Sequence, residues 1–135
     1  DIPQIIIVPA DPNLFTGTWK SQGIDPFINL TIVEKHSNDD YWTYFKGKVE
    51  CSVLSSGSLV FDVPSMFAFI GAARTGIGGE TVNTLIVSSE HINISGVLID
   101  SNTIQVATLE ITNNEGFSYE FDEEESDKVI TFQKQ

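Results

Sequence analysis

The stretch YWTYFKGKVE, residues 41–50, alternates between large apolar and charged side chains over much of its length. Successive side chains of a β-strand point to opposite faces, so this period of two predicts a strand rather than a helix. Tyr41, Phe45 and Val49 fall on one face, and Lys46 falls on the other with its charged neighbours. The segment is therefore expected to be a half-buried strand with one wet face.

The same pattern extends along most of the chain. Runs rich in β-branched and aromatic residues alternate with polar turn clusters at intervals of about ten residues. Sequential hairpins with one wet face favour closure into a barrel, because closure removes exposed strand edges. The predicted fold is all-β, a single antiparallel meander barrel of about eight to ten strands, with a β-sandwich as the alternative. We expect strands near residues 14–21, 27–36, 41–53, 58–63, 66–72, 81–89, 91–99, 103–112, 116–122 and 128–134.

The first residues differ from the rest in composition. Residues 1–13 hold three prolines around an apolar run, which excludes a helix and indicates an extended N-terminal arm. Packing of this arm on its own domain is favoured over pairing with a neighbouring subunit. The barrel domain is then expected to span residues 14–135.

One predicted strand contains a change of phase. Within residues 103–112 the apolar positions shift from Ile104 and Val106 to Leu109, a slip of one residue around Ala107. An extra residue in one strand of a pair has this effect, so the pattern predicts a β-bulge at this point.

The composition excludes several classes of protein. Hydrophobic residues make up 41% of the 135 residues and charged residues 19%, unlike a disordered chain. Nineteen acidic residues against seven basic ones give a formal charge of -12, which repels phosphate backbones and anionic lipid. Nucleic acid is therefore not an expected partner. The longest apolar stretch, residues 59–73, is interrupted by Asp62 and Pro64, so no membrane span is expected.

The segment Leu14-Phe15-Thr16-Gly17-Thr18-Trp19-Lys20 opens the first main strand. It resembles the Gly-x-Trp opening of the calycin barrels, the group of lipocalins, fatty-acid-binding proteins and avidin-like proteins. The resemblance implies that Gly17 and Trp19 form one structural end of the barrel. It also implies that a basic residue of the last strand, Lys128 or Lys134, lies over the indole.

No pattern of catalytic or cofactor-binding residues stands out. The carboxylates of residues 122–127 lack the spacing of a calcium loop and are expected to form a solvated turn. His36 and His91 are too few for a three-histidine zinc site, and Cys51 has no adjacent cation to activate it. We therefore expect no metal, no cofactor and no enzymatic activity.

The candidate binding region is residues 64–80, which join bulky apolar side chains to a glycine-rich stretch. Phe67, Phe69 and Ile70 are expected to line a portal or to anchor a partner, with Arg74 in the adjoining glycine-rich part. The alternative is a buried strand followed by a loop without a binding role.

Two functional hypotheses follow. The first is a non-enzymatic binding protein whose barrel holds a small apolar or amphipathic ligand. The second is a protein-interaction module, such as an inhibitor, immunity or adhesion factor, that meets a basic protein with its acidic surface and the 64–80 loop. The number of bulky inward-facing side chains discriminates between them, because a filled barrel has no ligand cavity. The oligomeric state stays open.

A secreted or periplasmic location is expected, because the sequence begins at Asp1 without an initiator methionine, as a processed protein does. Asn29 and Asn93 each begin a glycosylation acceptor pattern.

Overall fold

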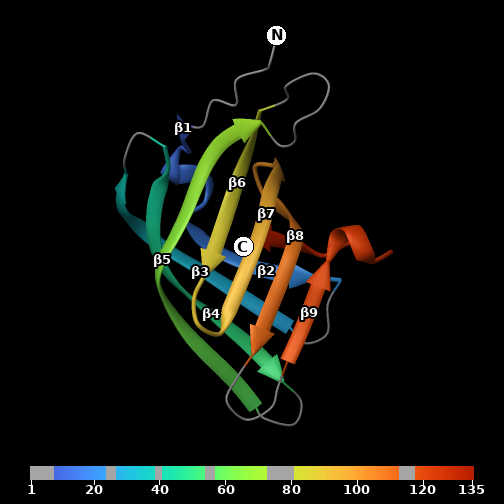
Figure 1. The fold of residues 1–135 in the computed structure, drawn as a ribbon. Coiled ribbons are helices and arrows are strands. Elements are labelled where there is room, and N and C mark those ends of the chain that lie inside the picture. The colour runs from blue at the N-terminus through green and yellow to red at the C-terminus, as the bar shows by residue number, and fades with distance from the viewer. Residues whose placement is uncertain (1–7, 24–26, 39–40, 54–56, 73–80, 113–117) are drawn as a thin grey trace.

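The structure is a computed structural model, and Figure 1 shows its fold. It describes residues 8–23, 27–38, 41–53, 57–72, 81–112 and 118–135. Among these residues, no helix is long and apolar enough to cross a membrane.

Eight antiparallel strands close into a barrel, in the meander order β2-β3-β4-β5-β6-β7-β8-β10, with β10 paired back to β2. The closure confirms the predicted all-β barrel and excludes the sandwich alternative. Two further strands lie beside it: β1 pairs with β5, and β9 pairs with β8. The strands are β1 (Val8–Pro9), β2 (Gly17–Gln22), β3 (Phe27–Asn38), β4 (Thr43–Val53), β5 (Gly57–Ala72), β6 (Thr81–Ser88), β7 (Ile92–Asp100), β8 (Thr103–Thr112), β9 (Ser118–Asp122) and β10 (Thr131–Lys134). Two 3-10 turns are η1 (Pro12–Leu14) and η2 (Glu123–Glu125).

The expected break between residues 58–63 and 66–72 is wrong, because β5 is continuous through Pro64. Phe45 pairs with Met66 and Gly47 with Val63, so two residues of β5 oppose one residue of β4. Such a bulge accommodates a proline, whose missing N–H would weaken a regular ladder. Residues 64–72 are therefore strand and not loop.

The bulge predicted at Ala107 is confirmed. Thr108 pairs with Ser95 and Val106 pairs with Gly96, so Ala107 is the extra residue of β8. The two halves of β8 also have different partners, β10 near Ile104 and β9 from Thr108 onward.

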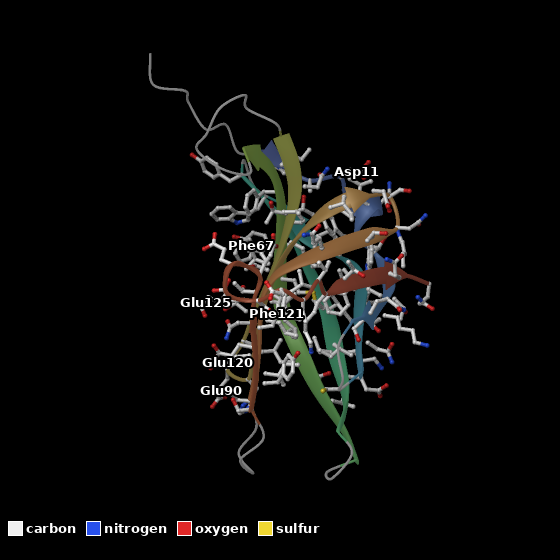
Figure 2. The ribbon with its side chains drawn as sticks, turned by 90° about the vertical axis from the view of Figure 1, so that its right-hand side faces the viewer. Asp11, Phe67, Glu90, Glu120, Phe121 and Glu125 are labelled. Carbon is white, nitrogen blue, oxygen red and sulfur yellow. The ribbon has the colours of Figure 1, made fainter. Side chains whose placement is uncertain are left out.

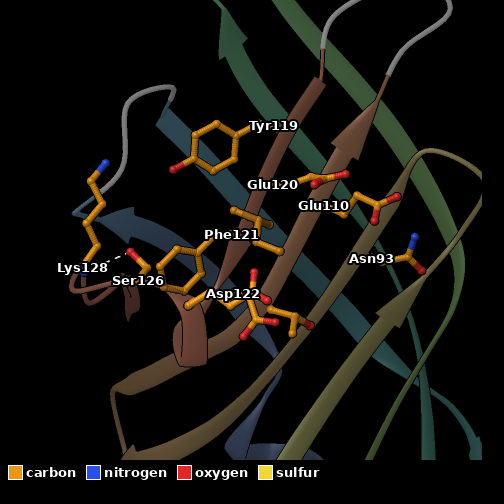
Figure 3. Close-up of a pocket in the computed structure, with 11 residues that line it drawn as sticks. Asn93, Glu110, Tyr119, Glu120, Phe121, Asp122, Ser126 and Lys128 are labelled. Atoms are coloured by element: carbon orange, nitrogen blue, oxygen red, sulfur yellow. Dashed lines mark hydrogen bonds between the residues drawn. The ribbon is translucent and has the colours of Figure 1, made fainter.

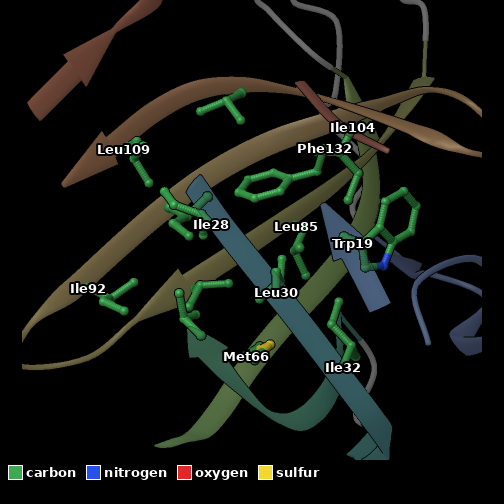
Figure 4. Packing of buried hydrophobic residues seen from close by; sticks show 14 of the residues in the cluster. Trp19, Ile28, Leu30, Ile32, Met66, Leu85, Ile92, Ile104, Leu109 and Phe132 are labelled. Atoms are coloured by element: carbon green, nitrogen blue, oxygen red, sulfur yellow. The ribbon is translucent and has the colours of Figure 1, made fainter. Parts of the chain in front are cut away.

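The inward-facing side chains form one core (Figure 4). Phe45 and Val49 belong to it, as their alternation predicts. Tyr41 does not: it is 57% exposed, because β4 begins only at Thr43 and the alternation does not reach back to it. The largest fully buried side chains are Trp19, Phe15, Phe45, Phe132, Ile28, Leu30, Ile32, Met66, Leu85, Ile92, Ile104 and Leu109.

Trp19 is fully buried in the core. Its indole Nε1 donates a hydrogen bond to the Phe15 carbonyl oxygen at 2.8 Å. Lys134 is its register partner on β10, and Lys134 Nζ lies 5.5 Å from the centroid of the indole ring. The cation over the indole is thus Lys134 and not Lys128. Gly17 has φ +132, and a Cβ there would lie 3.3 Å from the Lys134 side chain, so glycine suits this position.

Candidate functional site

The interior of the barrel is filled where the structure describes it. Trp19, Phe45, Met66 and Phe132 are all 0% exposed, and most of the core is exposed by no more than 2%. A water-sized space next to a side chain would expose it, so these side chains border no such space. The described interior therefore has no room for a ligand beside them.

The structure separates the residues proposed for the 64–80 region. Phe67 and Phe69 point to the outside of β5 and are half-buried. Ile70 lies on the opposite face and packs against the core. Arg74 lies outside the described residues. Phe67, Phe69 and Ile70 therefore do not share one surface, because adjacent residues of a strand face opposite ways.

Phe67 instead belongs to a cluster of four aromatic side chains on the outside of the barrel, here called the aromatic patch: Tyr41, Trp42, Tyr44 and Phe67. Ring centroids lie 5.6 Å apart for Trp42 and Phe67, 6.5 Å for Tyr44 and Phe67, and 6.3 Å for Trp42 and Tyr44. Tyr41 packs against Trp42 at 5.8 Å. These separations are typical of favourable tilted and edge-to-face pairs.

The geometry of the patch is fixed by the sheet beneath it. Tyr44 and Phe67 are direct register partners on β4 and β5. The Trp42 Nε1 donates a hydrogen bond to the Tyr44 hydroxyl, which satisfies the indole N–H within the patch. One feature of the sequence points to this patch: Trp42 and Tyr44 are large aromatic residues on the face of the strand that the alternation predicts to be exposed to solvent.

A second feature of the outer surface is a cleft of about 560 Å³ beside β9 (Figure 3). Four carboxylates and one ammonium group are among its lining, so the charge around it is strongly negative. We call it the acidic cleft; its polar lining includes Glu110, Tyr119, Glu120, Asp122, Glu125 and Lys128. The cleft was not foreseen from the sequence, which indicated only a solvated turn at 122–127. Asp122 does form a turn there, accepting a hydrogen bond from the Glu124 N–H at 2.9 Å.

One row of register partners joins the aromatic patch to the acidic cleft. Figure 2 shows Phe67, Glu120 and Glu125 on the same side of the molecule. Neighbouring strands lie about 4.8 Å apart, so the two ends of the row are separated by roughly 24 Å along the surface. The row runs through Tyr44, Phe67, Ile86, Ser95, Thr108 and Asp122. Patch and cleft are thus parts of one outer face, formed by β4 to β9.

Glu110 and Glu120 are direct cross-strand partners, and both are exposed. Like charges in this arrangement oppose strand pairing. We expect Glu110→Gln to raise the free energy of unfolding by about 0.2–1 kcal/mol at low salt, with the gain shrinking as salt is added. Urea denaturation at two salt concentrations measures this. Glu90→Gln, which removes an exposed carboxylate at the β6–β7 turn, is the control, and an equal gain from it would contradict local repulsion.

The single cysteine of the chain, Cys51, is buried. Burial raises the pKa of the Cys51 thiol, so the protonated and unreactive form is favoured at neutral pH. Among the residues that the structure describes, no group of three or more His, Cys, Asp or Glu side chains is arranged to hold a metal ion.

Comparison with known proteins identifies no relative: no family model, no curated protein and no solved structure matches the chain.

Proposed function

We propose that the chain is a non-enzymatic binding protein that holds a basic protein partner against the outer face of β4 to β9. The observation that carries the proposal is the aromatic patch, which lies outside a barrel whose described interior is already filled. A ligand inside the barrel, the first hypothesis from the sequence, is less well supported for the same reason. The second hypothesis, a protein-interaction module, is the one we adopt.

The aromatic patch has the composition of a binding anchor. Trp and Tyr are enriched among the residues that dominate binding energy at protein interfaces, and they lose little conformational entropy on binding. Trp42, Tyr44 and Phe67 are half-buried and pack against one another. Their side chains are therefore partly ordered already, and less conformational entropy is lost when a partner binds.

Charge indicates the nature of the partner. The chain carries a formal charge of -12, and the acidic cleft concentrates carboxylates on the same face as the aromatic patch. Such a field accelerates encounter with a positively charged protein and disfavours acidic ones. Lys46 and Lys48 follow Tyr44 along β4 and are exposed, so the outer face has basic residues on β4 and acidic residues at the cleft. This uneven distribution of charge would favour one orientation of the partner.

The end of the barrel supports a further proposal, that the chain has a calycin-like barrel. Gly17, Trp19 and Lys134 lie together as the resemblance implies, with the ammonium group over a buried indole. This likeness concerns architecture and carries no statement about a ligand.

The test starts from a phage library of random short peptides selected on the intact chain. We expect enriched peptides to combine Lys or Arg with apolar residues, and their binding to weaken as salt is raised. Phe67→Ser should weaken the binding of these peptides about 30-fold, as truncation of a central aromatic anchor costs about 2 kcal/mol.

Val60→Ser is the matched control, because Val60 is an exposed apolar residue of the same strand. Circular dichroism and the thermal midpoint show whether each variant is folded. Selected peptides without a basic bias, or binding that folded Phe67→Ser retains in full, would overturn the proposal.

A further inference from the structure

The strand β9 has an open edge in the described part of the structure. It pairs with β8 through Thr108 to Thr112 and with no other described strand, and Figure 1 shows it at the margin of its layer. The edge of a strand presents backbone N–H and C=O groups that another extended chain can pair with. No proline or lysine, the usual guards of such an edge, is present within Ser118–Asp122.

The alternation of β9 defines two faces along this edge. Glu120 and Asp122 lie on the outer face and line the acidic cleft with Glu110 of the neighbouring strand. Tyr119 and Phe121 lie on the other face, where Tyr119 packs against the core and Phe121 is buried. An added strand would therefore meet carboxylates with every second residue, and the residues between would lie beside the half-buried ring of Tyr119.

We propose that the β9 edge binds an extended basic segment of the partner by strand addition, with Lys or Arg at alternate positions and apolar residues between them. This inference rests on the proposed function and specifies how the partner is held. Directly opposed side chains of paired strands have Cβ atoms about 4.5–5.5 Å apart, within reach of an ion pair with Glu120. Backbone pairing supplies affinity, and the alternating side chains supply selectivity.

Charge disfavours a second copy of the chain as the strand that pairs with the β9 edge. Two β9 edges in antiparallel pairing would place Glu120 and Asp122 of one copy among the same carboxylates of the other, and like charges disfavour that pairing. A basic strand instead neutralises the repulsion between Glu110 and Glu120. Lys128, on the far side of the cleft, disfavours a basic residue close to it and so limits the register of the segment.

The experiment titrates the isotopically labelled intact chain with a Lys-Val-Lys-Val-Lys peptide and follows backbone amides by NMR. We expect shifts and slowed hydrogen exchange at residues 118–122. A peptide of the same composition in blocks, Lys-Lys-Lys-Val-Val, should bind at least about tenfold more weakly, because it cannot match the two faces. Glu120→Gln should weaken binding about two- to fivefold, as for an exposed ion pair, and Glu90→Gln should leave it unchanged.

N-methylation tests the backbone pairing directly. Two versions of the alternating peptide carry N-methyl groups on one edge or on the other, and at least one should lose about tenfold or more in affinity. Strand addition would be overturned if both N-methylated peptides bound as tightly as the unmethylated peptide. It would also be overturned if the backbone amides of residues 118–122 were unperturbed. Library peptides that require Phe67 but do not perturb β9 would leave the proposed function standing and the strand addition refuted.

Discussion

Replacing Trp19 with alanine is expected to lower the free energy of unfolding by about 3–5 kcal/mol, the range for a large buried aromatic side chain. Trp19 is 0% exposed and is among the largest fully buried side chains of the core. The substitution leaves a cavity at the barrel end, removes the donor to the Phe15 carbonyl oxygen and removes the ring beneath Lys134. Urea denaturation of wild type and variant measures the loss.

Trp42→Ala is the matched control, because Trp42 is half-buried on the outer surface. Trp42→Ala should lower the free energy of unfolding less than Trp19→Ala does. A larger loss for Trp42→Ala would contradict the assignment of Trp19 to the core. Trp42→Phe leaves Trp19 as the single fluorophore among the tryptophans of the chain. Emission from that variant should lie well to the blue of indole in water and shift to the red on unfolding.

The barrel could be predicted because its signals are local. Alternation places Phe45 and Val49 in the core, and the phase slip at Ala107 marks a real bulge. The continuity of β5 could not be predicted, because a proline inside a strand pattern usually ends the strand. Pro64 is accommodated by a register shift between β4 and β5, and that shift is a property of the pair of strands.

The candidate site was only partly predictable, because it too depends on the register between strands. Phe67 was singled out by its apolar neighbourhood, but Trp42 and Tyr44 reach it only through the pairing of β4 with β5. The acidic cleft requires β8 to leave β10 and pair with β9. A single sequence shows which face a residue occupies, whereas the register between strands decides which residues meet.

The sharpest test of that register is Gly47→Ala, which we expect to destabilise the chain by about 3 kcal/mol, the upper part of the range for overpacking. Gly47 sits at register shifts in two ladders, pairing with Ile32 of β3 and Val63 of β5. A Cβ there would overlap the Thr31 carbonyl oxygen and lie 2.5 Å from Met66 Cε. The flexible Met66 side chain can yield, but the Thr31 carbonyl belongs to the backbone of β3 and cannot move alone.

Gly96→Ala provides the comparison, since its nearest atoms, the Gln105 carbonyl oxygen and Ile104 Cγ2, both lie 2.8 Å from the added Cβ. In urea denaturation, Gly47→Ala should lower the free energy of unfolding more than Gly96→Ala, because the Cβ added at residue 47 lies closer to a backbone atom. Adding Met66→Ala to Gly47→Ala should give no recovery, because the clash with Thr31 stays and the core loses a buried side chain. Full wild-type stability of Gly47→Ala would mean that β3 and β4 are not paired in this register.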